Sequence, residues 1–273
     1  MTEPADNKRK ERIQFESAPV NEVVIGLYHV PITELRSQHI GIYWNTIRDR
    51  YPLCEQQPPI AQAPEQIDLS GLLHQMGGEV YPLPRFWFSS ETHSTLIQVQ
   101  RNAFCLNWRR GEGVYPHYES VETDFWSAFE GYKRFVEGAL EGKLDVVKRC
   151  ELTYVNLIGT SNFFSCPAAI KHVLPPIAGL CDVQNEARRL LGLNVSATYQ
   201  LTDHLRIASS VKLGRRKDTN EEVALFELKA LETPKDLSLD GARAWYKVAH
   251  DAIYDFFLYF TDKEAQKELW KPR

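Results

Sequence analysis

The chain has 273 residues and carries 36 acidic against 32 basic side chains, which gives a formal net charge of −4 at pH 7. This balance provides no cationic field over the whole molecule, so nucleic-acid binding would need a local basic patch. Apolar residues make up 43% of the chain, which excludes a disordered composition and leaves either one large domain or two closely packed halves.

The N-terminal residues and the cysteines indicate a cytoplasmic protein. Residues 1–17 are polar and charged, with a basic run at 8–12, and lack the apolar core of a secretory signal. No uninterrupted apolar run reaches the about 18 residues that a membrane span needs. The five cysteines are widely spaced without a CxxC pair, as is typical of reduced thiols. We therefore expect no membrane association, a cytoplasmic location and a mobile charged leader over residues 1–18.

The first half of the sequence predicts a strand, an excursion, a three-stranded meander and a long helix. The β-branched and aromatic run at 22–29 predicts the strand, and apolar residues at helical spacing predict a helix within 32–50. A Pro-, Gln- and Gly-rich connection over 56–84, with a short helix at 69–76, is suited to a lid or a partner-binding loop. The antiparallel meander and its aromatic helix follow at 85–89, 94–101, 103–110 and 123–141.

The second half repeats this order. A strand at 148–158 is followed by a loop-like stretch over 159–192 that contains a short helical turn at 168–173. Three strands and a final aromatic helix then follow at 194–201, 205–213, 222–231 and 240–260.

The repeated order predicts an α+β fold that arose by internal duplication. We expect two similar halves, 19–145 and 146–273, each an antiparallel meander with a long aromatic helix. The two meanders are expected to join into one continuous curved sheet with the helices on one face, as a single domain. The other face, or a groove, would then be left for binding.

The sequence lacks the motifs that identify common catalytic sites. Neither GxGxxG nor GxxxxGK[ST] occurs, and GxSxG, HExxH and CxxC are also absent. The doublet His250-Asp251 matches part of a phosphohydrolase metal site, but no other segment supplies the remaining ligands, so a helix-surface pair explains it better. We therefore expect no metal and no cofactor, and the sequence leans away from an enzyme.

Amides, arginines and an indole along two neighbouring strands form the candidate binding site. Alternation places Gln98 and Gln100 on one face, where they could bind a planar or anionic group together with nearby arginines. A basic turn at 215–217 would match the pair at 109–110 under the duplication and would suit phosphates, although turn chemistry and one solvated sheet face explain the same residues. The candidate residues are Gln98, Gln100, Arg101, Asn107, Trp108, Arg109, Arg110, Arg215, Arg216 and Lys217.

An ordered set of motifs carries a family resemblance over nearly the whole chain. The motifs are Pro19-Val-Asn-Glu-Val-Val-Ile-Gly, His39-Ile-Gly-Ile-Tyr-Trp, Leu96-Ile-Gln-Val-Gln-Arg, Asn107-Trp-Arg-Arg with Tyr115-Pro-His-Tyr-Glu, and Cys150-Glu-Leu-Thr-Tyr-Val-Asn. Together they resemble a sporadically distributed prokaryotic family of uncharacterised proteins of about this length. That family has no established activity, so the resemblance transfers no catalytic residue. Its patchy distribution among bacteria implies an accessory gene, as in toxin–antitoxin or phage-defence systems.

Three functional hypotheses follow. The first is a non-catalytic binding protein, antitoxin-like or phage-defence-associated, which engages a protein partner encoded nearby. The alternative is a nucleic-acid- or nucleotide-binding module that uses the Gln98–Arg110 strand pair and the basic turns. The third is an enzyme with an unfamiliar site around Arg101, Asn107 and His117.

Overall fold

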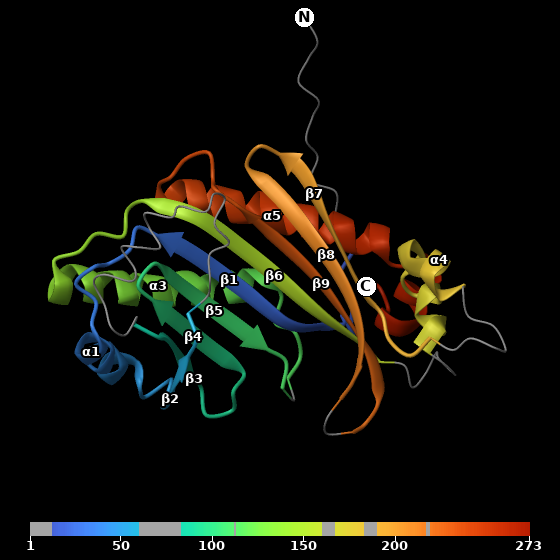
Figure 1. Ribbon diagram of the computed structural model, residues 1–273, viewed down its shortest axis with the longest axis horizontal. Helices are drawn as coiled ribbons and strands as arrows, with labels where there is room; N and C mark the ends of the chain where they lie inside the picture. Colours follow the sequence, from blue (N-terminus) through green and yellow to red (C-terminus); the bar gives the residue numbers. More distant parts are fainter. Residues whose placement is uncertain (1–12, 60–82, 112, 160–166, 183–189, 217–218) are drawn as a thin grey trace, which may run out of the picture.

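The computed structural model describes residues 13–59, 83–111, 113–159, 167–182, 190–216 and 219–273. Within these ranges, nine strands form one antiparallel sheet in the order β2-β3-β4-β5-β1-β6-β9-β8-β7 (Figure 1). The first half of the chain contributes β1 (Val20–His29), α1 (Ser37–Ile47), β2 (Leu53–Gln57), β3 (Arg85–Ser89), β4 (Thr95–Gln100), β5 (Ala103–Arg109) and α3 (Tyr118–Leu140).

The second half contributes the other four strands and the C-terminal helices. Its strands are β6 (Val147–Gly159), β7 (Asn194–Thr202), β8 (Leu205–Arg215) and β9 (Glu222–Glu232). Its helical elements are η1 (Pro167–His172), η2 (Pro175–Ile177), α4 (Ala178–Cys181), α5 (Leu239–Phe260), α6 (Lys263–Ala265) and the π-helical turn η3 (Gln266–Trp270). The predicted α+β class, with two similar halves joined in one sheet, is confirmed.

A pseudo-two-fold relation connects the halves. β1 and β6 lie antiparallel at the centre, and each is flanked by the last strand of its own meander, β5 beside β1 and β9 beside β6. Val24 lies opposite Thr153 at the middle of this central pair. Glu22 lies two residues before Val24, and Glu151 lies two residues before Thr153. The two glutamates therefore occupy equivalent positions on the same sheet face.

The long helices α3 and α5 cover one face of the sheet (Figure 1). Alternate residues of β1, namely Val23, Ile25 and Leu27, are fully buried on this face and belong to the core that the helices close. Tyr246 of α5 donates a hydrogen bond of 2.7 Å to the backbone oxygen of Gly26, which fixes the helix over the central strand. Phe125 of α3 contacts the Tyr246 ring edge-on at 5.8 Å, so the two helices share one aromatic core.

Local sequence signals mark the ends of both long helices. The Ser238 hydroxyl accepts a hydrogen bond from the Gly241 N–H at 3.1 Å and caps the start of α5. α3 begins after His117, whose φ of 68° lies in the left-handed region, and ends at Glu141, which is also left-handed. No helix in the ranges above is both long enough and apolar enough to cross a membrane.

The structure differs from the sequence prediction in three places, and one further prediction falls on residues that it does not describe. β2 was not predicted, and α3 begins at Tyr118 rather than near residue 123. From Ile13 onward the leader is not separate from the fold, because Phe15 bridges to Pro272 and the backbone N–H of Glu16 donates to the oxygen of Lys271. The predicted helix at 69–76 lies outside the described residues, as does most of the 56–84 connection.

Candidate functional site

Two of the predicted residues, Gln98 and Asn107, meet on the sheet face opposite the helices. The Gln98 amide donates a hydrogen bond of 2.6 Å to the Asn107 side-chain oxygen, and the Asn107 amide donates one of 2.7 Å to Glu22. Both amide side chains are buried. They are therefore held in a fixed orientation by internal hydrogen bonds.

Two arginines and an indole complete this group. Arg85 and the Trp87 indole N–H both donate to the Gln98 side-chain oxygen, at 2.8 and 3.0 Å, and Arg109 donates to Glu22 at 2.8 Å. The guanidinium carbons of Arg85 and Arg109 lie 5.3 and 5.4 Å from the Trp87 ring centroid, within cation–π range. We call Glu22, Arg85, Trp87, Gln98, Asn107 and Arg109 the first-half cluster.

The equivalent position in the second half holds a buried carboxylate. Glu151 accepts hydrogen bonds from the Tyr28 hydroxyl at 2.8 Å and the Thr153 hydroxyl at 3.1 Å, and its oxygen lies 2.7 Å from the Lys229 ammonium. Lys229 lies opposite Thr153 on β9, just as Asn107 lies opposite Val24 on β5. We call Glu151, Tyr28, Thr153 and Lys229 the second-half cluster.

Several polar groups of this face are protonated or already hydrogen-bonded within the protein. Burial raises the pKa of the Cys105 thiol to about 12, so the thiol stays protonated and is a poor nucleophile at neutral pH. Burial also raises the pKa of Tyr28 far above its ordinary value, so its hydroxyl remains a neutral donor to Glu151. The carboxylates of Glu22 and Glu151 already accept the hydrogen bonds described above. These groups are in states suited to holding structure rather than to proton transfer.

The other predicted residues on the first meander do not join this cluster. Gln100 lies toward the turn between β4 and β5, where its amide donates to Asn102 at 2.7 Å, and Arg101 lies in the turn itself. Trp108 points to the opposite face, is only 9% exposed and packs against Tyr115 at 5.4 Å. Its place in the core contradicts its assignment to a binding surface.

The remaining arginines are dispersed. Arg110 donates to the backbone oxygen of Ala18 and lines a cavity on the helix side of the sheet. Arg215 forms an ion pair of 2.7 Å with Glu222 at the far end of the β8–β9 hairpin, and Arg216 follows it. Lys217 lies outside the described residues.

The proposed symmetry between the two basic turns is wrong. Arg109 ends β5, the third strand of the first meander, whereas Arg215 ends β8, the second strand of the other. The strand order makes the β8–β9 turn the equivalent of the β4–β5 turn at 101–102. The three residues of the enzyme hypothesis are also apart, since Asn107 faces away from the helices while His117 lines the helix-side cavity.

Of the two clusters, sequence analysis predicted only Gln98, Asn107 and Arg109. It missed the remaining members, Glu22, Arg85, Trp87, Tyr28, Glu151, Thr153 and Lys229. Glu22 and Glu151 each lie in the first strand of their half, but their equivalence appears only in the register of the β1–β6 pair. The contact of Glu22 with Arg109 joins strands far apart in the chain, which alternation alone does not reveal. No cluster of three or more side chains suited to metal binding occurs among the described residues.

The sheet presents one long edge strand, β7, which pairs with β8 along one side only within the described residues. Its nine residues, Asn194–Thr202, include no charged residue, no proline and no glycine. Tyr199 and Leu201 are 40% and 38% exposed. Natural proteins usually protect such an edge with charges, prolines or bulges. The only irregularity in the pairing of β7 with β8 lies between Gln200 and Thr202, and the pairing from Asn194 to Gln200 is regular. This regular, uncharged stretch is suited to pairing with another strand.

The opposite edge, β2, is short and protected. It spans only Leu53–Gln57, includes Glu55, and lies between Pro52 and Pro58. Proline cannot donate to a neighbouring strand, and a charge opposes pairing, so this edge is blocked in ways that β7 is not.

Comparisons of this chain with protein-family models, with curated proteins and with solved structures found no match.

Proposed function

We propose that this chain is a non-catalytic binding protein that engages a protein partner by adding a partner strand to β7. The observation that carries the proposal is the uncharged nine-residue edge of β7, with its second side unpaired in the described part of the sheet. Strand addition supplies main-chain hydrogen bonds for affinity and side-chain contacts for specificity.

Side chains beside this edge add an apolar contact surface. Tyr199 packs edge-on against Phe256 of α5 at 5.3 Å while remaining partly exposed. Tyr259, on the same helix, is 79% exposed. Partly exposed aromatic side chains are enriched in protein interfaces, which supports a protein partner over a solvated edge.

The proposed role in the cell follows the family resemblance. An antitoxin-like or phage-defence-associated component would hold a protein encoded nearby, and strand addition is a mode by which one chain can hold another without chemistry. The protonated thiol of Cys105 and the engaged carboxylates of the sheet face support a non-catalytic role.

The test places charges on one edge at a time. The full chain is purified from the cells that produce it and analysed by native mass spectrometry, together with Ser196→Lys/Thr198→Lys on β7. Both replaced side chains are exposed. The matched control, Leu53→Lys/Gln56→Lys, adds the same charge to the exposed β2 edge.

We expect one identified polypeptide at fixed stoichiometry with the wild type and the control, and its loss in the β7 variant. Retention in the β7 variant, or no bound polypeptide with the wild type, contradicts the proposal.

A second candidate function, the binding of an anionic or nucleotide ligand, is favoured by the two guanidiniums on Trp87. Of the predicted pair Arg109 and Arg110, only Arg109 lies over the Trp87 ring. The variant Arg85→Ala/Arg109→Ala should weaken binding of a single-stranded oligonucleotide and flatten its salt dependence. Arg215→Ala/Arg216→Ala removes the same charge from the distant hairpin and serves as the control. An equal salt slope in both variants would rule this function out.

A further inference from the structure

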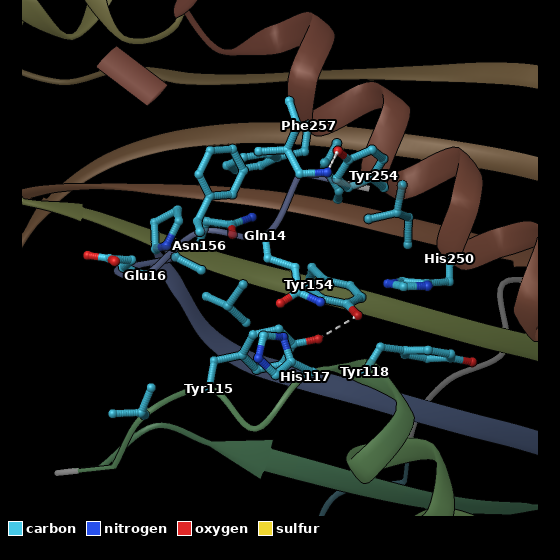
Figure 2. Close-up of a pocket in the computed structure, with 18 of the residues that line it drawn as sticks. Gln14, Glu16, Tyr115, His117, Tyr118, Tyr154, Asn156, His250, Tyr254 and Phe257 are labelled. Atoms are coloured by element: carbon cyan, nitrogen blue, oxygen red, sulfur yellow. Dashed lines mark hydrogen bonds between the residues drawn. The ribbon is translucent and has the colours of Figure 1, made fainter. Parts of the chain in front are cut away.

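A cavity of about 210 Å³ lies on the helix side of the sheet, between the start of α3 and the middle of α5 (Figure 2). Its walls come from β6, β9, α5, the loop before α3 and the segment that begins at Ile13. An apolar cavity of roughly 150 Å³ is large enough to hold benzene. The cavity in this protein therefore has room for one ring or two fused rings.

Aromatic rings form much of the cavity wall. His250 of α5 stacks on Tyr118 with the ring centroids 4.0 Å apart and the planes 17° apart. Tyr154 of β6 is nearly parallel to the same His250 ring, at 19° and 6.0 Å, and Tyr115 meets Tyr154 edge-on at 6.3 Å. A planar ligand in this space would meet ring faces and ring edges, the contacts that aromatic groups prefer.

A few polar atoms lie among these rings. The hydroxyls of Tyr115 and Tyr154 share a hydrogen bond of 2.9 Å, which Figure 2 shows at the lower side of the cavity. Burial raises the pKa of Tyr154 well above its ordinary value, so this hydroxyl stays protonated and neutral. Gln14 and Asn156 add amide groups to the lining. The cavity thus combines an apolar body with convergent hydrogen-bonding groups, as small-molecule sites do.

The charged side chains of the lining cancel. Glu16 and Glu119 are balanced by Arg110 and Arg273, and the Arg273 Nε lies 3.7 Å from a Glu16 carboxylate oxygen. A lining without net charge has no long-range attraction for an ion, and the burial of an unpaired ionic ligand would be unfavourable. The lining therefore favours a neutral ligand.

We propose that this cavity is a binding site for a small, neutral aromatic or heteroaromatic molecule of one or two fused rings, held against the His250 and Tyr154 rings. The site lies among the helices and the N-terminal segment and does not use the β7 edge. A test of this cavity is therefore independent of a test of partner binding at β7.

Indole is a suitable probe because it is neutral, has two fused rings and carries one N–H donor. Its binding to the full chain is measured by calorimetry and by saturation-transfer NMR, beside cyclohexanol as a neutral non-aromatic control and benzoate as a charged one. We expect saturable binding of indole and at least tenfold weaker binding of both controls. No binding of indole up to about 10 mM, or equal binding of cyclohexanol, overturns the proposal.

Variants on α5 locate the site. His250→Ala removes one ring face and should weaken indole binding about three- to tenfold, the range expected for one lost aromatic contact. His250→Phe keeps a ring there and should restore the affinity to within about twofold. Tyr259→Ala removes a 79% exposed ring from the same helix and should leave binding unchanged. If His250→Ala folds, as judged by its circular dichroism, and binds indole as the wild type does, the site is not in this cavity.

Discussion

At equivalent positions of the two halves, Glu22 accepts hydrogen bonds from the neutral Asn107 and from Arg109, whereas Glu151 pairs with the ammonium of Lys229. The sheet that joins these positions ends in a short, proline-flanked edge on the first-half side and in a long, uncharged edge on the other. The two halves therefore share the order of their meander strands around the central pair but differ in their polar interior and in their outer edges. The differences identify where each half is sensitive to substitution and to pH.

The largest expected effect is on the pH dependence of the unfolding free energy, and it comes from a histidine of the first half. Burial lowers the pKa of His29 to about 4 from its ordinary 6.5, and its Nδ1 donates to the Val30 backbone oxygen at 2.8 Å. Below about pH 6.5 the unfolded chain takes up a proton that the folded chain does not accept until about pH 4. Unfolding free energy should therefore fall by about 3 kcal/mol between pH 7 and pH 4 through this group.

The variant His29→Asn can still donate to Val30 and should lack this component of the pH dependence. Denaturant titrations at pH 7 and pH 4 measure it. The matched variant His204→Asn changes an exposed histidine of the second half and should keep the wild-type dependence. Identical pH profiles for His29→Asn and the wild type would contradict the assignment to His29.

The next largest effect is expected at the second-half cluster. Lys229→Met leaves Glu151, which is 8% exposed, without its cation, and removal of one partner of a buried ion pair is strongly destabilising. Because the Tyr28 and Thr153 hydroxyls remain and Lys229 is partly exposed, we expect a loss of about 2 kcal/mol in unfolding free energy. Denaturant unfolding at pH 7 measures this loss. The double variant Glu151→Leu/Lys229→Met should recover most of it, and an additive loss would argue against coupling.

The equivalent substitution in the first half should cost less. Asn107→Leu removes the amide between Gln98 and Glu22, but Arg109 still bonds Glu22, which is more exposed than Glu151. We expect a loss of about 1 kcal/mol in unfolding free energy. The comparison with Lys229→Met under the same conditions is the measurement. A larger loss for Asn107→Leu would reverse the ranking of the two clusters.

The smallest effect on stability should come from β7, the edge that we propose for partner binding. Ser196 and Thr198 on β7 are exposed, so Ser196→Lys/Thr198→Lys should change the unfolding free energy by less than about 0.5 kcal/mol. The thermal midpoints of this variant and of Leu53→Lys/Gln56→Lys on β2 should agree closely. A marked destabilisation of the β7 variant would mean that lost partner binding reflects lost folding.

Much of the fold follows from the sequence because its two halves carry the same periodic pattern. Alternating apolar positions fix the strands of both meanders, and aromatic residues at helical spacing fix α3 and α5. β2 was missed because its sequence, LCEQQ, offers neither alternation nor β-branched residues, and its pairing with β3 lies across a long connection. Tertiary pairing, rather than local preference, makes it a strand.

The candidate site was only partly predictable for a related reason. The two-residue period of a strand places Gln98 on the polar face, and the same period turns Trp108 away from its neighbour Asn107. Grouping residues 107–110 by their closeness in sequence therefore mixed the two faces. The partners Glu22 and Trp87 come from other strands, so they could be found only from the register.

The contact between Phe15 and Pro272 brings the two ends of the described chain side by side. The described residues from Ile13 to Arg273 thus form nearly a closed ring, in which the loop between α3 and β6 is the second junction of the halves. A circular permutant with its old ends joined and new ends between Gly142 and Lys143 would place the second half first in the chain while leaving every strand pair in place. The strand pairing therefore predicts that the order of the two halves along the chain can be exchanged without changing how they assemble.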